Sequence, residues 1–138
     1  MIEQLSHLTV YVLDQDEALV FYRDKLGFEV RNDVKTPNFR WLTVSPKPQP
    51  GLELALVPVD GNPQLSADAA AKLRELVRAG TFRIGVFETS DCQGTYEELK
   101  ARGVEFAAPP AERFYGVEAI VKDSSGNWFT LVQRTTRG

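Results

Sequence analysis

The feature that most constrains the fold of this chain is an internal repeat. When the sequence is shifted by 76 positions, residues 9–11 fall on residues 85–87, and residues 27–30 (Gly-Phe-Glu-Val) fall on residues 103–106 (Gly-Val-Glu-Phe). Each copy contains a β-rich run, a helical stretch that ends at a glycine, and further extended segments. Self-similarity at a fixed period indicates two copies of one supersecondary unit.

The first copy is expected to contain one strand, one helix and three more strands. Residues 8–12 are mostly β-branched or aromatic, as strands prefer. Asp14, with Glu17 three positions later, resembles a capping box, and the helix that it starts is expected to continue to Gly27, which can end it in a left-handed conformation. The further strands are expected at residues 28–30, 40–44 and 52–57.

A Pro/Gly/Asn-rich linker at residues 58–65 precedes a helix that Ser66 caps and that runs to about residue 79. The second copy then follows, with a strand at 82–87, a helix from Cys92 to Gly103, and extended segments at 104–107, 117–122 and 128–133. In the turn between the last two, Asp123 and Asn127 are interpreted as turn residues and nothing more. We therefore expect a single domain over residues 1–138, made of module one (1–57), a linker and helix (58–80) and module two (81–138).

Composition narrows the class of protein. Hydrophobic residues at 43% and charged residues at 25% are typical of a globular chain. A net charge of −3 without a basic cluster argues against nucleic acid as a partner. The chain has no apolar run long enough to span a membrane, no secretory signal pattern, and a lone cysteine that cannot form an internal disulfide. These features predict a cytoplasmic protein that binds neither nucleic acid nor membrane.

Four segments resemble the vicinal-oxygen-chelate superfamily, which includes glyoxalase I, extradiol dioxygenases, fosfomycin-resistance transferases and bleomycin-resistance proteins. They are residues 7–10 (His-Leu-Thr-Val), 21–28 (Phe-Tyr-Arg-Asp-Lys-Leu-Gly-Phe), 115–118 and 123–127. The resemblance spans nearly the whole chain. It implies an α+β fold of two tandem βαβββ modules that form an open, cup-shaped mixed sheet with helices outside. It does not settle function, because this cup serves several chemistries and some pure binding proteins.

The resemblance also implies where a metal would bind. The metal-using members present four ligands on the inner face of the cup, and these positions match His7, Glu53, Arg83 and Thr130 here. Arginine has no lone pair to donate and keeps its positive charge, while a threonine hydroxyl is a poor ligand for Mg²⁺, Zn²⁺ or Fe²⁺. We therefore expect no metal and no cofactor, with His7 and Glu53 as vestigial positions. A metal would need substrate oxygens or residues not matched here.

Strand alternation predicts which other side chains face the cup. The predicted ligand-binding set contains Tyr11, Phe39, Trp41, Phe87 and Trp128, together with His7, Glu53, Arg83 and Thr130. An aromatic pocket with a few convergent polar groups is the usual make-up of a small-molecule site, and aromatic faces suit flat ligands. Within this set, Arg83 and Glu53 are expected to form an ion pair at the former metal position.

These features predict a metal-independent binding protein of the glyoxalase/bleomycin-resistance type that sequesters an aromatic or antibiotic-like ligand. We also predict a homodimer with the cups at or near the subunit interface. The alternative is a metal-dependent lyase, isomerase or dioxygenase of the glyoxalase group with a partial metal site, and a third reading is an interaction module without a ligand. Whether any reaction is catalysed stays open. Cys92 has no basic neighbour in the sequence and is not expected to be catalytic.

Overall fold

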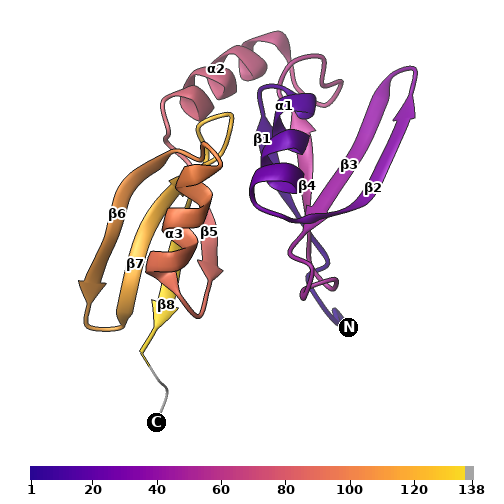
Figure 1. The fold of residues 1–138 in the computed structure, drawn as a ribbon. Coiled ribbons are helices and arrows are strands. Elements are labelled where there is room, and N and C mark those ends of the chain that lie inside the picture. The colour runs from indigo at the N-terminus through magenta and orange to yellow at the C-terminus, as the bar shows by residue number, and fades with distance from the viewer. Residues whose placement is uncertain (136–138) are drawn as a thin grey trace.

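The computed structural model describes residues 1–135 and confirms two tandem βαβββ modules (Figure 1). Module one contains β1 (His7–Val12), α1 (Gln15–Leu19), the π-helix η1 (Val20–Lys25), β2 (Glu29–Thr36), β3 (Phe39–Ser45) and β4 (Glu53–Pro58). Helix α2 (Ala67–Arg78) leads to module two, which contains β5 (Arg83–Glu88), α3 (Cys92–Ala101), β6 (Phe106–Arg113), β7 (Gly116–Lys122) and β8 (Trp128–Arg134). The expected end of module two at residues 136–138 lies outside the described residues.

Each module forms its own four-stranded mixed sheet, which we call the first sheet and the second sheet. The strand orders are β1-β4-β3-β2 and β5-β8-β7-β6, so the two sheets have the same topology. In each, the first and last strands of the module pair in parallel, and the other pairs are antiparallel. No helix within residues 1–135 is long and apolar enough to cross a membrane.

The alternation predicted for β1 is confirmed. Val10 and Val12 are fully buried in the core, whereas His7 and Thr9 on the opposite face are exposed. The parallel register places Val10 beside Leu56 of β4, which is also buried. One face of the first sheet therefore covers the core, and its other face, which we call the inner face, is open.

The first helix differs from the expected continuous α-helix. It starts as predicted, because the Asp14 carboxylate accepts a hydrogen bond from the backbone N–H of Glu17 at 2.9 Å. At Val20 it widens into the π-helix η1. The adjacent residues Phe21 and Tyr22 are then both buried in the core. The segment ends at Gly27, whose φ of 77° is the expected left-handed conformation.

Strands β2 and β6 are longer than the sequence predicts. They extend over residues 29–36 and 106–113, instead of 28–30 and 104–107. Both lie at the outer edge of their sheets, where polar residues face solvent and prolines are tolerated because the missing N–H would point outward. In β6 the register with β7 also shifts between Ala108 and Ala111, so Pro109 and Pro110 stand outside the regular ladder and remove no hydrogen bond from it.

A buried hydrogen-bond cluster around Asp123 connects the two modules. Its carboxylate accepts three backbone N–H bonds from residues 125–127 at 2.9–3.0 Å, one from the Asn127 amide at 3.0 Å and one from the Tyr22 hydroxyl at 2.8 Å. Asn127 also donates to the backbone carbonyl of Tyr11 at 2.8 Å. The interpretation of Asp123 and Asn127 as turn residues only is therefore wrong, because both also hold module one against module two.

The Tyr22 hydroxyl provides a test of this connection. Burial raises the pKa of Tyr22 well above its usual value, and the negative charge and hydrogen bond of Asp123 raise it further. Tyr22→Phe should lower the free energy of unfolding at pH 7 by about 1–2 kcal/mol, since it removes one donor from a buried carboxylate. Because a tyrosine in the unfolded chain ionises near pH 10, the stability that Tyr22 provides is present below that pH and is lost above it. The difference between wild type and variant in urea denaturation should therefore shrink above about pH 10.

Tyr96→Phe is the matched control for this measurement. Among residues 1–135 the one side chain that hydrogen-bonds to the Tyr96 hydroxyl is the exposed Lys100, which donates at 3.1 Å, so loss of this hydroxyl should leave stability nearly unchanged. Equal stabilities of wild type and Tyr22→Phe would contradict the role given to the Asp123 cluster.

Candidate functional site

The two vestigial positions lie together on the inner face of the first sheet. His7 and Glu53 are register partners at the start of β1 and β4, and His7 Nε2 lies 3.5 Å from Glu53 Oε2. The other carboxylate oxygen, Oε1, accepts a hydrogen bond from the Thr43 hydroxyl at 2.6 Å and one from the Asn32 amide at 3.0 Å. Two neutral donors therefore hold one oxygen of the Glu53 carboxylate, and the His7 ring lies beside the other.

This donor set does not fit a divalent metal site. Thr43 and Asn32, which surround Glu53, offer a hydroxyl and a carboxamide N–H, and both act here as donors to the carboxylate. Across residues 1–135, no three His, Cys, Asp or Glu side chains converge as they would around a metal. Strand alternation places Thr43 on the cup face, but the sequence does not predict that Thr43 and Asn32 bond to Glu53, because their approach depends on the register of three adjacent strands.

Arg83 lies away from Glu53, on the second sheet. Its guanidinium lies over the Trp128 ring, 5.6 Å from the ring centroid. The pKa of Glu118 on β7 is lowered by a hydrogen bond from Tyr115, and the positive charges of Arg113 and Arg83 lower it further. No ion pair joins Arg83 to Glu53 in the described part of the chain, so that expected pairing is wrong within one chain. The physical reason is that the two residues belong to sheets that share no strand pairing.

Phe87 also differs from its expected placement. The register between β5 and β8 shifts between Arg83 and Gly85, after which Phe87 pairs beside Leu131. Its ring stacks on Phe129 with centroids 4.1 Å apart, so it contributes to the core and to a separate pocket of about 480 Å³ near Phe28. A β-bulge reverses the alternation that follows it, and the sequence carries no clear signal for this one.

Two aromatic residues of β3, Phe39 and Trp41, form what we call the aromatic shelf. Their rings are stacked with centroids 6.3 Å apart and an interplanar angle of 24°, and the His7 ring lies 5.7 Å from that of Trp41. Phe39 is 44% exposed, a large fraction for a phenylalanine. The remaining predicted side chains divide between the sheets, with Tyr11 on β1, and Trp128 and the buried Thr130 on β8.

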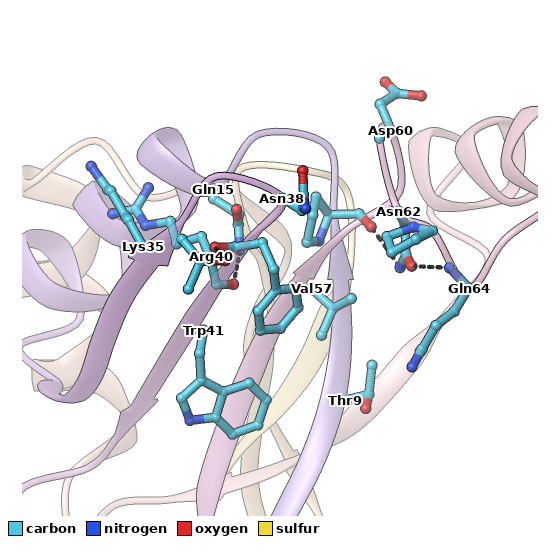
Figure 2. A pocket seen from close by; sticks show the side chains of 15 residues that line it. Thr9, Gln15, Lys35, Asn38, Arg40, Trp41, Val57, Asp60, Asn62 and Gln64 are labelled. Atoms are coloured by element: carbon cyan, nitrogen blue, oxygen red, sulfur yellow. Dashed lines mark hydrogen bonds between the residues drawn. The ribbon is translucent and has the colours of Figure 1, made fainter.

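A pocket of about 540 Å³ lies beside this shelf (Figure 2), within the size range of small-molecule sites. Apolar groups of the shelf and of Val57 and Pro58 line it, together with carboxamide side chains. The lining residues that the sequence did not predict are Thr9, Gln15, Lys35, Thr36, Asn38, Arg40, Val57, Pro58 and Asp60–Gln64. The Asn- and Pro-containing linker after β4 was one available signal, since binding residues often lie in loops.

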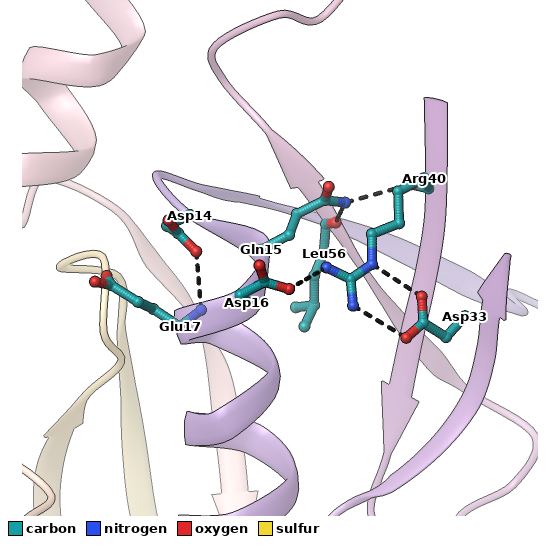
Figure 3. Close-up of polar contacts among 7 residues, drawn as sticks. All are labelled: Asp14, Gln15, Asp16, Glu17, Asp33, Arg40 and Leu56. Atoms are coloured by element: carbon teal, nitrogen blue, oxygen red, sulfur yellow. Dashed lines mark hydrogen bonds and ion pairs between the residues drawn. The ribbon is translucent and has the colours of Figure 1, made fainter. Parts of the chain in front are cut away.

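The Arg40 side chain forms a network behind this pocket (Figure 3). Its guanidinium donates two hydrogen bonds to Asp33 at 2.9 and 3.0 Å and one to Asp16 at 2.6 Å. These bonds, with Asp33 first, raise the pKa of Arg40, and the pKa of Asp33 is lowered in return, mainly by its hydrogen bonds from Arg40. With a side chain only 12% exposed, Arg40 serves to tie β2, β3 and α1 together.

The environment of Cys92 is that of a buried core residue. Its side chain is fully buried beside Leu131, and burial, followed by the negative charge of Asp91, raises the pKa of its thiol. A protonated, enclosed thiol is a poor nucleophile. This placement agrees with the expectation that Cys92 is not catalytic.

Two βαβββ modules, each with an open inner face, define the class of cup-forming α+β proteins. The model of the Glyoxalase/Bleomycin resistance protein/Dioxygenase superfamily matches residues 4–131. The chain therefore belongs to this superfamily, as its motifs predict.

Individual relatives cover nearly the whole chain. The crystal structure of UcmS2 is 45% identical in sequence and superposes with a TM-score of 0.92 over 96% of this chain and 99% of that one. The crystal structure of TnmS3, an antibiotic binding protein from Streptomyces sp. CB03234, is 28% identical and has a TM-score of 0.75, covering 97% of this chain and 98% of that one. The protein YetH of Bacillus subtilis (strain 168) is 37% identical over 132 residues, which are 95% of this chain and 98% of YetH.

Proposed function

We propose that this protein binds a small, planar aromatic molecule without a metal and sequesters it. The observation that carries the proposal is the aromatic shelf beside a pocket of about 540 Å³. Aromatic rings in such a pocket favour flat ligands, which gain stacking and apolar burial together. One oxygen of the Glu53 carboxylate already accepts hydrogen bonds from the neutral Thr43 hydroxyl and Asn32 amide, which supports a site where protein donors hold this side chain in place of a metal ion.

An antibiotic-like compound is the ligand class that the relatives favour. TnmS3, which shares the fold and 28% of the sequence, is an antibiotic binding protein. Sequestration would lower the free concentration of such a compound and so confer resistance without transforming it. We further propose a cytoplasmic location, because the buried thiol of Cys92 suits a reducing compartment.

We also propose a homodimer in which the inner face of the first sheet of one protomer meets the inner face of the second sheet of its partner. Several large apolar side chains are exposed on strands and loops of both modules: Leu5 (63%), Val34 (54%), Phe39 (44%), Val86 (45%) and Phe114 (96%). Exposed apolar groups of this size favour burial against a partner. The opposite charges of Glu53 on the first sheet and Arg83 on the second would suit contact between the two faces in different protomers.

One observation supports the alternative, a metal-dependent lyase, isomerase or dioxygenase. His7 and Glu53 lie within 3.5 Å of each other at the two positions that match the metal ligands of the family. Substrate oxygens would have to complete the coordination of the ion. The binding experiment that follows separates this alternative from sequestration.

Tryptophan fluorescence tests the binding directly. Titration with 1-naphthol as a planar probe should quench the emission of Trp41, which lines the pocket, saturably. Trp41→Ala should weaken binding by about 1–3 kcal/mol, the range for losing a large apolar stacking contact. A chelator should leave the affinity unchanged, because no metal joins ligand and protein in this proposal.

The matched control is Leu54→Val, a change on the buried face of β4. It should cost stability and leave the affinity for the probe unchanged. Loss of affinity in the presence of chelator, or an affinity that depends on His7 and Glu53 and is unchanged in Trp41→Ala, would favour the metalloenzyme instead.

The dimer is testable by light scattering. At micromolar concentration the protein should have about twice the 15.4 kDa mass of one chain, and Phe39→Asp should shift it toward the monomer, because a charge on the inner face would then be buried at the interface. An inner-face charge that left the dimer intact, or a wild-type protein that remained monomeric, would rule out this arrangement.

A further inference from the structure

The pocket lies where the first sheet opens. Strands β3 and β4 pair only at Thr43–Ala55 and Val44–Leu54, although β3 begins earlier, at residue 39, and β4 continues to residue 58. In Figure 1, β2 and β3 lean away from β1 and β4. A continued register would pair Trp41 with Val57, but both residues line the pocket (Figure 2). The pocket is thus built over an opening between two strands.

The side chain of Gln15 bridges this opening. Its amide nitrogen donates to the carbonyl of Arg40 on β3 at 3.3 Å and to the carbonyl of Leu56 on β4 at 2.8 Å (Figure 3). Backbone carbonyls can only accept, so the NH₂ group must face both strands, and the side-chain oxygen must point elsewhere. The hydrogen bonds therefore fix the orientation of the amide.

The Gln15 oxygen remains available to a ligand. Among residues 1–135 it accepts no hydrogen bond, and no fully buried side-chain oxygen or nitrogen there lacks a partner. It is therefore open to solvent, and Gln15 lines the pocket. An acceptor that gives up water to a ligand without a donor loses a hydrogen bond, which weakens binding of that ligand.

The Arg40 guanidinium behind the pocket does not offer a competing interaction. All three hydrogen bonds of the Arg40 guanidinium go to Asp33 and Asp16, the latter being next to Gln15 in α1 (Figure 3). The same bonds hold β3 and α1 in place, and thereby Gln15 itself and one of the two strands that it bridges. The Gln15 oxygen is thus a neutral acceptor in a fixed orientation, and the charged side chains of Lys35 and Asp60 line other parts of the pocket.

We infer that Gln15 determines ligand specificity by selecting an aromatic ring that carries a hydrogen-bond donor, such as a phenolic hydroxyl or an N–H group. This rests on the proposed function, because the ring must first bind beside the aromatic shelf. Discrimination by a fixed acceptor arises from the penalty on ligands that leave it unpaired. The ligand class is therefore a planar, hydroxyl- or amine-bearing arene.

The test compares 1-naphthol with 1-methoxynaphthalene, which has the same ring system and no donor. Dissociation constants would be measured by calorimetry for wild type, Gln15→Met and the control Gln93→Met, which changes an exposed glutamine on α3. Wild type and the control should bind 1-naphthol about tenfold more tightly, since tenfold corresponds to about 1.4 kcal/mol. The ratio should fall to about one in Gln15→Met. A general loss of pocket shape would weaken both probes and leave their ratio in place.

A second measurement needs no variant. In ¹⁵N-labelled wild type, the side-chain amide resonances of Gln15 should shift on addition of 1-naphthol and shift much less with 1-methoxynaphthalene. Equal affinities for both probes in wild type, or a preference that persists in Gln15→Met, would overturn the role of Gln15 and leave the proposed function standing. If wild type binds neither probe, the proposed function itself fails, and the inference fails with it.

Discussion

The buried carboxylate of Asp123 is the interaction on which the rest of the structure depends. Five hydrogen bonds end on it, four from its own turn and one from the Tyr22 hydroxyl of the other module. A buried charge of this kind is tolerated only when it is fully hydrogen-bonded, so the turn and η1 must meet. With Asn127 bonded to the Tyr11 carbonyl, this contact sets how the two sheets lie relative to each other. Their helix-covered faces share one core, and their inner faces stay open.

On the inner face of module one, hydrogen bonds occupy the place that a metal would take in other members of the superfamily. Thr43 and Asn32 donate to Glu53, and His7 lies on its other side. Such a network keeps the carboxylate in position through protein donors. What remains is a surface for recognition: stacked rings, neutral amides and a pocket at the opening between β3 and β4. This combination suits binding better than bond breaking.

Much of this fold could be predicted from the sequence, because local signals agreed with one another. The repeat identified the two modules, Asp14 and Gly27 marked the ends of a helix, and the alternation of β1 placed His7 opposite the core. Prediction failed where a single extra residue changes a strand. Because of the bulge after Arg83, the Phe87 side chain packs against Phe129 in the core. No periodicity rule anticipates a bulge.

The remaining site residues could not be predicted because they act through contacts between distant segments. Gln15 matters only because two strands separate in front of it. Asn32 and Thr43 matter only because adjacent strands bring them to the same carboxylate. Likewise, the pairing of Arg83 with Glu53 was inferred from opposite charges, while the sheets that carry these residues are joined by no strand pairing.

The central claim is that this cup works without a metal, and the metal content of the protein tests it most directly. The protein would be purified without chelator and analysed by inductively coupled plasma mass spectrometry, then titrated calorimetrically with Zn²⁺, Ni²⁺, Mn²⁺ and Fe²⁺. The account predicts far less than one equivalent of any of these metals per chain, and no saturable binding that His7→Ala or Glu53→Gln removes. One equivalent of a divalent metal that is lost in both variants would contradict it.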